Sequence, residues 1–307
     1  MERTKQFQIL RILLIFYIFF IHCDENIFRG GLDIVSYFFV VAGFLFNRDK
    51  YPNYQNYITN RLKKIFIPYY IVLVLYLIFY YVRYEYSFVL HLFLLQSWIP
   101  STTTCYYHYV SVSWFCSSLL FCYIFFPLFS KCVEKYTNIF AIIALCGIFL
   151  ICRFNYGNLN EWTKYINPFL RLLNFTLGYV LMLKIRNIEP QKTSFWIPFL
   201  GIIIYLGILL KCRSYMFISI SSVAIIYILY IYKNRLFDTL FCNNLVLFLA
   251  KNAIYFYLVH QVVIGYIFWT LREHSPIVKY VLSLVLTLMF SIIIGKCTKM
   301  INKLLDK

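Results

Sequence analysis

The chain has 307 residues, of which 62% are hydrophobic and only 13% charged, and its formal net charge is +17. A soluble domain has about 45–50% apolar and about 25% charged residues, so this composition excludes an ordinary soluble protein. Apolar runs recur along the whole chain, which predicts one all-α integral membrane domain over residues 1–307. We attribute the positive charge to basic loops beside the membrane and expect no nucleic-acid partner.

The first apolar run is enclosed by two ionisable residues. Residues 12–21 are apolar, Arg11 precedes them and His22 follows them. On an α-helix this spacing is about three turns, so both side chains project from one face, about 16 Å apart along the axis. Ionisable groups in membrane helices are costly and usually face a protein interior or a wet cavity. The pair predicts a helix that holds an anion at one end and moves a proton at the other. No small-residue cleavage site follows, so we expect a retained helix.

The apolar runs predict about ten transmembrane helices, at about 8–23, 33–46, 65–82, 113–130, 139–152, 169–184, 195–210, 214–232, 245–267 and 278–295. Nineteen Lys and Arg residues then fall on the side of the termini and eight on the opposite side, which predicts that both termini are cytoplasmic. The run 88–99 is too short to span and predicts an interfacial or re-entrant helix. His91, His108 and His274 fall in outer loops, where we expect them to be solvated.

Further basic residues lie at or within the predicted spans. Arg61 and Lys64 are three residues apart and share a helix face at the start of the third span. Two cations beside a helix N-terminus can bind phosphate, while ordinary anchoring on the positive side of the membrane is the alternative. Arg171 falls inside the sixth span, where it either binds an anion or hydrogen-bonds between helices.

The cysteines give no sign of a metal site. The chain has ten cysteines, mostly inside apolar runs, and shows no CxxC pair and no Cys/His metal spacing. We therefore expect them to pack in the core, and we expect neither a bound metal nor a permanently bound cofactor.

Six short motifs, in this order, resemble those of the membrane-bound acyltransferase-3 family, which includes O-acetyltransferases of bacterial surface polysaccharides. They are Arg11 with His22, and the segments 36–45, 61–70, 113–127, 170–178 and 248–261. The resemblance covers roughly residues 8–295. The chain departs from the family pattern at Ala42, where the family has a serine, and it has no acidic residue in the 113–127 motif.

The resemblance implies transfer of an acyl group, usually acetyl, from acetyl-CoA as co-substrate to a hydroxyl of a lipid-linked or cell-surface glycan. It implies a multi-pass protein of the bacterial inner membrane. Arg11, Arg61 and Lys64 would bind the phosphates of acyl-CoA. His22 would act as general base on the acceptor hydroxyl, with a transient acyl-His as the alternative.

Three further residues are candidates near the transferred group. Trp114 and Ser117, or backbone N–H groups, are candidate donors to the developing oxyanion. His260 would either line the acceptor side or pack in the bundle.

The main alternative is a flippase or a polymerase of a glycan assembly pathway. A flippase would need paired repeats around a cationic cavity, and the sequence shows no clear repeat. A polymerase would need a larger outer loop than residues 83–112. The sequence leaves open the acceptor sugar, the identity of the acyl group and the oligomeric state.

Overall fold

The computed structural model describes residues 5–24, 34–47, 53–80, 85, 87–100, 103–154, 157–212 and 214–305. Within these ranges helices dominate, and a parallel pair of two-residue strands joins β1 (Gln191–Lys192) to β2 (Tyr232–Lys233). In chain order the helices are α1 (Gln6–Cys23), α2 (Val35–Phe44), α3 (Tyr54–Phe79), α4 (Ser87–Leu92), α5 (Thr103–Tyr107), α6 (Ser113–Lys135), α7 (Thr137–Arg153), α8 (Pro168–Ile185), α9 (Trp196–Lys211), α10 (Tyr215–Ile231), α11 (Arg235–Phe241), α12 (Asn244–Thr270) and α13 (Pro276–Leu305).

The helices confirm an all-α, multi-pass membrane protein. Among the described residues, six helical segments are long and apolar enough to cross a membrane: α1, α3, α6, the segment Gly157–Ile185 that ends in α8, α12 and α13. Four shorter apolar helices are α2, α7, α9 and α10. Each predicted span overlaps one of these helices. The count of ten crossings and the cytoplasmic side of the termini stay predictions.

The start of α3 differs from the prediction. The helix begins at Tyr54, where the Asn53 side chain caps it by accepting the Asn56 backbone N–H at 2.8 Å. Arg61 and Lys64 therefore lie inside the helix, and the prediction that a helix N-terminus lies beside them was wrong. The reason is that hydropathy rises only after Lys64, whereas an N-cap residue starts a helix whatever the polarity of its first turns.

The loop between α3 and α6 folds back onto the bundle and corrects a second expectation. His91 of α4 is fully buried rather than solvated, and its Nε2 lies 2.8 Å from the Cys105 carbonyl oxygen. This burial lowers the pKa of His91 to about 4, so its ring is neutral. His108 is partly exposed beside Glu85, and His274 is exposed, as expected.

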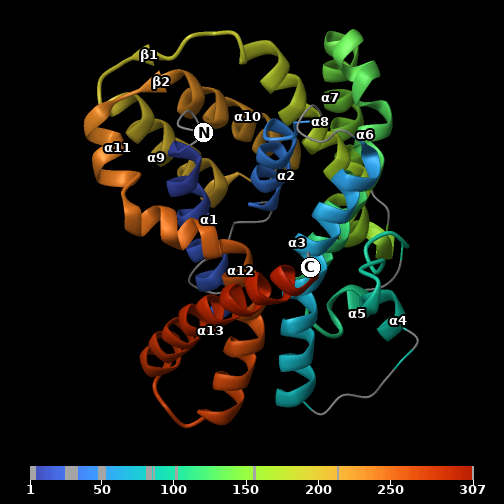
Figure 1. The fold of residues 1–307 in the computed structure, drawn as a ribbon, viewed down its shortest axis with the longest axis vertical. Helices are drawn as coiled ribbons and strands as arrows, with labels where there is room; N and C mark the ends of the chain where they lie inside the picture. Colours follow the sequence, from blue (N-terminus) through green and yellow to red (C-terminus); the bar gives the residue numbers. More distant parts are fainter. Residues whose placement is uncertain are drawn as a thin grey trace.

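Helices α2 and α8 pack in close backbone contact at two glycines. A Cβ on Gly43 would lie 1.9 Å from the Phe175 carbonyl oxygen, and one on Gly178 would lie 1.9 Å from the Val40 carbonyl oxygen. Small residues allow membrane helices to approach this closely. Helix α1 packs between α10 and α12. The helix with Arg11 and His22 therefore runs through the interior (Figure 1).

Candidate active site

Two cavities lie along α1, one near each end. The cavity near its N-terminal end, about 250 Å³, is lined by α1, α2, α3, α6 and α12 and contains Arg11, Arg61 and Lys64; we call it the basic cavity. The cavity near its C-terminal end, about 380 Å³, contains His22; we call it the histidine cavity. Ile18, Val35 and Tyr257 line both. These three residues therefore form a wall that the two cavities share, so the cavities adjoin inside the bundle.

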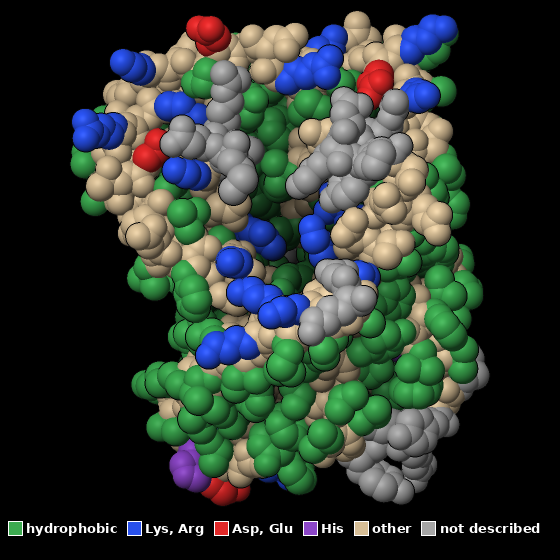
Figure 2. Space-filling view, viewed as in Figure 1, with side chains coloured by type: hydrophobic (Ala, Val, Ile, Leu, Met, Phe, Trp, Pro, Cys, Tyr) green, Lys and Arg blue, Asp and Glu red, His purple; other side chains and the backbone are tan. Residues whose placement is uncertain are grey.

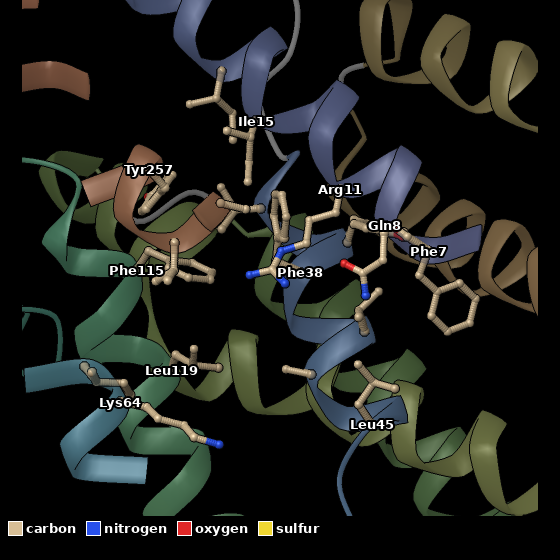
Figure 3. A pocket seen from close by; sticks show the side chains of 18 of the residues that line it. Phe7, Gln8, Arg11, Ile15, Phe38, Leu45, Lys64, Phe115, Leu119 and Tyr257 are labelled. Carbon is tan, nitrogen blue, oxygen red and sulfur yellow. The ribbon is translucent and has the colours of Figure 1, made fainter. Parts of the chain in front are cut away.

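The basic cavity brings together cations from two helices. Figure 3 shows the Arg11 guanidinium reaching from α1 into the cavity, and Lys64 of α3 on its other side. The Arg61 guanidinium lies 4.7 Å from the centre of the Tyr123 ring and 5.3 Å from that of Tyr57. Such cation–π contacts hold an arginine in place without neutralising its charge. In Figure 2, Lys and Arg side chains gather around the hollow at the centre of this face.

Between the cations and the histidine the lining is apolar and aromatic. Ile15, Phe38, Val41, Phe115 and Leu119 line the basic cavity. Where the two cavities adjoin, the Tyr257 hydroxyl donates to the Val112 carbonyl oxygen at 3.2 Å, which fixes the ring at the junction. The inside of the bundle thus changes from cationic to apolar to polar along α1.

His22 contacts α12. The Gln261 amide nitrogen lies 2.8 Å from His22 Nδ1 and 3.2 Å from Nε2, although the two residues are 239 positions apart in the chain. The Ser111 hydroxyl donates to Gln261 Oε1. Both Ser111 and Gln261 line the histidine cavity. The imidazole is therefore held by a chain of two polar side chains from other parts of the fold.

His260 lies behind His22. The centres of the two rings are 5.2 Å apart, and His260 is buried. Its Nδ1 lies 2.5 Å from the Tyr257 carbonyl oxygen, and its Nε2 has no hydrogen-bond partner among the residues described. His260 is absent from the residues that line the cavity, so it supports the site from the core.

The remaining wall of the histidine cavity is aromatic and carries a carboxyl group. Trp114 and Tyr165 line it with their rings 4.7 Å apart. The Tyr107 hydroxyl donates to Glu161 Oε1 at 2.6 Å. Ser117 is placed elsewhere: it is buried, its hydroxyl lies 2.6 Å from the Ser97 hydroxyl, and it lines neither cavity. Of the three further candidates, Trp114 thus faces the cavity, His260 backs it, and Ser117 is outside it.

Arg171 holds this wall to α2. Its Nη1 donates to the Ser36 hydroxyl at 2.9 Å and its Nε donates to the Tyr165 carbonyl oxygen at 2.8 Å. The guanidinium carbon lies 5.8 Å from the centre of the Trp114 ring. Of the two roles that the sequence left open for Arg171, these contacts match the interhelical one.

The sequence did not single out five residues of the histidine cavity that have a role in the site, namely Tyr107, Ser111, Glu161, Tyr165 and Gln261. For Gln261 a signal existed, because it ends the sixth motif and follows His260 directly. Tyr107, Ser111 and Glu161 lie in or beside loops, where no helical periodicity assigns a face. In the described ranges, no group of three or more His, Cys, Asp or Glu side chains is arranged to hold a metal ion.

Comparison with known proteins gives a match over nearly the whole chain. A family model described as an acyltransferase domain matches residues 5–296. The matched range includes every residue that lines the two cavities. No curated protein and no solved structure matched the chain.

Proposed function

The chain belongs to the acyltransferase-3 family, and on that premise we propose that it transfers an acyl group, in the simplest case acetyl, from acyl-CoA to a hydroxyl of a lipid-linked or cell-surface glycan. The observation that supports this is the pair of cavities that adjoin inside the bundle, with cations at one end and an imidazole at the other. Such an arrangement suits a donor and an acceptor that approach from opposite ends.

In this proposal the donor occupies the basic cavity. Arg11, Arg61 and Lys64 bind phosphate groups of CoA, because a guanidinium or ammonium forms charge-assisted hydrogen bonds with phosphate oxygens. The apolar lining beyond the cations accommodates the slim pantetheine arm and directs the thioester toward the junction at Tyr257. The predicted topology puts this cavity on the cytoplasmic side of the bacterial inner membrane, where acyl-CoA is found.

The acceptor occupies the histidine cavity. Glu161 and Ser111 offer hydrogen-bonding groups for hydroxyls, and Trp114 and Tyr165 offer apolar ring surfaces. Binding sites for small polar ligands combine such an aromatic lining with a few well-placed polar groups.

His22 is the general base. It takes the proton of the acceptor hydroxyl while the oxygen attacks the thioester carbonyl carbon. A C–O bond forms, the C–S bond breaks, and the CoA thiolate leaves and receives the proton from the imidazolium. Such proton transfer contributes about 10²–10⁴-fold in rate. In the alternative, the imidazole first takes the acyl group and then passes it to the hydroxyl.

Replacing His22 tests this function. We expect His22→Ala to abolish O-acetyl esters on the host glycan, measured by NMR, because the variant lacks the general base. The exposed His274→Ala is the matched control and should retain acylation. Full ester content in His22→Ala, at equal amounts of membrane-inserted protein, would exclude His22 as the base. A flippase or polymerase would yield no ester in any variant.

A further inference from the structure

We propose that Gln261 is a positioning residue for His22 and that Ser111 holds Gln261 in place. The inference rests on the proposed function of His22 as general base. It assigns to α12 the role of setting which ring nitrogen of His22 carries a proton.

The contacts come from three separate parts of the fold. His22 is in the last turn of α1, Gln261 is in α12, and Ser111 precedes α6. The Gln261 amide lies against both ring nitrogens, at 2.8 and 3.2 Å, and the Ser111 hydroxyl binds the opposite end of the amide. Because both ends of the amide are engaged, it restrains the His22 ring on the side of α12.

The chemistry of the carboxamide explains why this position matters. A neutral imidazole has one N–H and one lone pair, and a general base needs the lone pair on the nitrogen that faces the hydroxyl. In the arrangement described, the amide nitrogen donates to the ring and occupies a lone pair. With the amide turned by half a rotation, Oε1 accepts the Nδ1 hydrogen and the Nε2 lone pair is free for the acceptor. In the turned arrangement the Ser111 hydroxyl accepts from the amide nitrogen, and we assign this arrangement to the active enzyme.

Gln261 carries no charge, and this matters for a neighbouring general base. A carboxylate at this position would stabilise the imidazolium, which would leave the base protonated over more of the pH range. A carboxamide orients the ring without this effect. Other titratable groups also lie around His22 among the described residues: Tyr107, Glu161, Tyr165, Tyr257 and His260. Cys23 and Asp24 follow it in the chain, and Asp24 accepts a hydrogen bond from Tyr280 of α13 at 2.9 Å. These groups are the same in every Gln261 variant, so differences between variants report on Gln261.

The first test is direct and needs no acceptor. The full chain is labelled with ¹⁵N-histidine in detergent micelles, and the His22 resonances, one of five histidines, are assigned from their loss in His22→Gln. We expect the Nδ1–H tautomer in the wild type, a mixture in Gln261→Met, and in Gln261→Glu a protonation midpoint raised by about one pH unit or more, as for an opposite charge within hydrogen-bond reach. Unchanged tautomer populations in Gln261→Met and an unchanged midpoint in Gln261→Glu would overturn the proposal.

The second test measures O-acetylation of the host glycan in membranes supplied with acetyl-CoA. Gln261→Met should lower kcat about tenfold and leave KM for acetyl-CoA unchanged, and Ser111→Ala should have a smaller effect in the same direction. Gln261→Glu should move the acidic limb of the pH profile to higher pH. Thr270→Ala, at an exposed position of α12, is the control. If Gln261 had only a structural role, Gln261→Glu would not move the acidic limb of the pH profile. If the NMR coupling holds but His22→Ala still acylates the glycan, the role of His22 as general base fails and the contact between Gln261 and His22 stands.

Discussion

At the scale of single residues, the site has a cationic part and a polar part. The cations of the basic cavity come from α1 and α3, and the polar groups around His22 come from α1, α12 and the turn before α6. No acidic side chain lines the basic cavity in the described part of the chain, so Arg11, Arg61 and Lys64 present their charge to whatever enters it. If these cations only anchored the protein on the positive side of the membrane, they would lie near the same membrane face but would not need to face a cavity.

The Arg61 and Lys64 pair gives a test at this scale. Replacing both with Ala should weaken acetyl-CoA binding by at least about 100-fold, because each hydrogen bond to a charged group contributes about 1.5–3 kcal/mol. The expected signature is a raised KM for acetyl-CoA with kcat nearly unchanged at saturation. Arg235→Ala with Lys192→Ala, two exposed cations outside both cavities, is the matched control. An unchanged KM would mean that Arg61 and Lys64 only set topology.

The sequence indicated part of this site. The spacing of Arg11 and His22 predicted two groups on one face of one helix, and the structure places them on two cavities that adjoin. The contact between His22 and Gln261 could not be predicted, since it joins residues 239 positions apart and depends on how α1 packs against α12. Ser117 shows the converse. Its motif named the right helix, but burial against Ser97 turns its hydroxyl away from the cavity.

At the scale of elements, hydropathy predicted the existence of helices better than their ends. All ten predicted spans overlap helices, because a membrane-spanning or core helix must be apolar over most of its length. The start of α3 was missed because the Asn53 cap lies among polar residues. The burial of His91 was missed because its partner is a backbone carbonyl of another loop segment, which no pattern in the sequence reveals.

The packing of α2 on α8 gives a stability prediction. Gly43→Ala should destabilise the protein by about 1–3 kcal/mol or more, because its Cβ would meet the backbone of Phe175 at 1.9 Å and the helices would have to separate. The expected result is a midpoint of thermal unfolding in detergent that is lower by several degrees.

Gly207→Ala in α9 is the control for this substitution. Among the described residues, no atom outside the backbone of its own helix turn lies within 4 Å of its Cβ position, so the variant should be neutral or slightly more stable. If the two variants unfold at the same temperature, the close contact between α2 and α8 does not contribute to stability.

At the scale of the whole molecule, motifs from distant parts of the chain converge on α1. The second motif supplies α2, the third supplies Arg61 and Lys64, and the sixth supplies Tyr257 and Gln261. Their order in the chain indicated the family, and the family match over residues 5–296 confirms it. How they enclose two adjoining cavities along one helix follows only from three-dimensional packing.

We expect the acyl group to enter at the basic cavity and to leave at the histidine cavity, and an assay with acetyl-CoA on one membrane face measures this. Sealed membrane vesicles of known orientation receive labelled acetyl-CoA on one face only, and labelled ester is measured on the glycan exposed at the other face. We predict ester when acetyl-CoA is added on the face of the basic cavity, none when it is added on the opposite face, and none from either face with His22→Ala. Equal labelling from both faces, or labelling that survives in His22→Ala, would contradict the account.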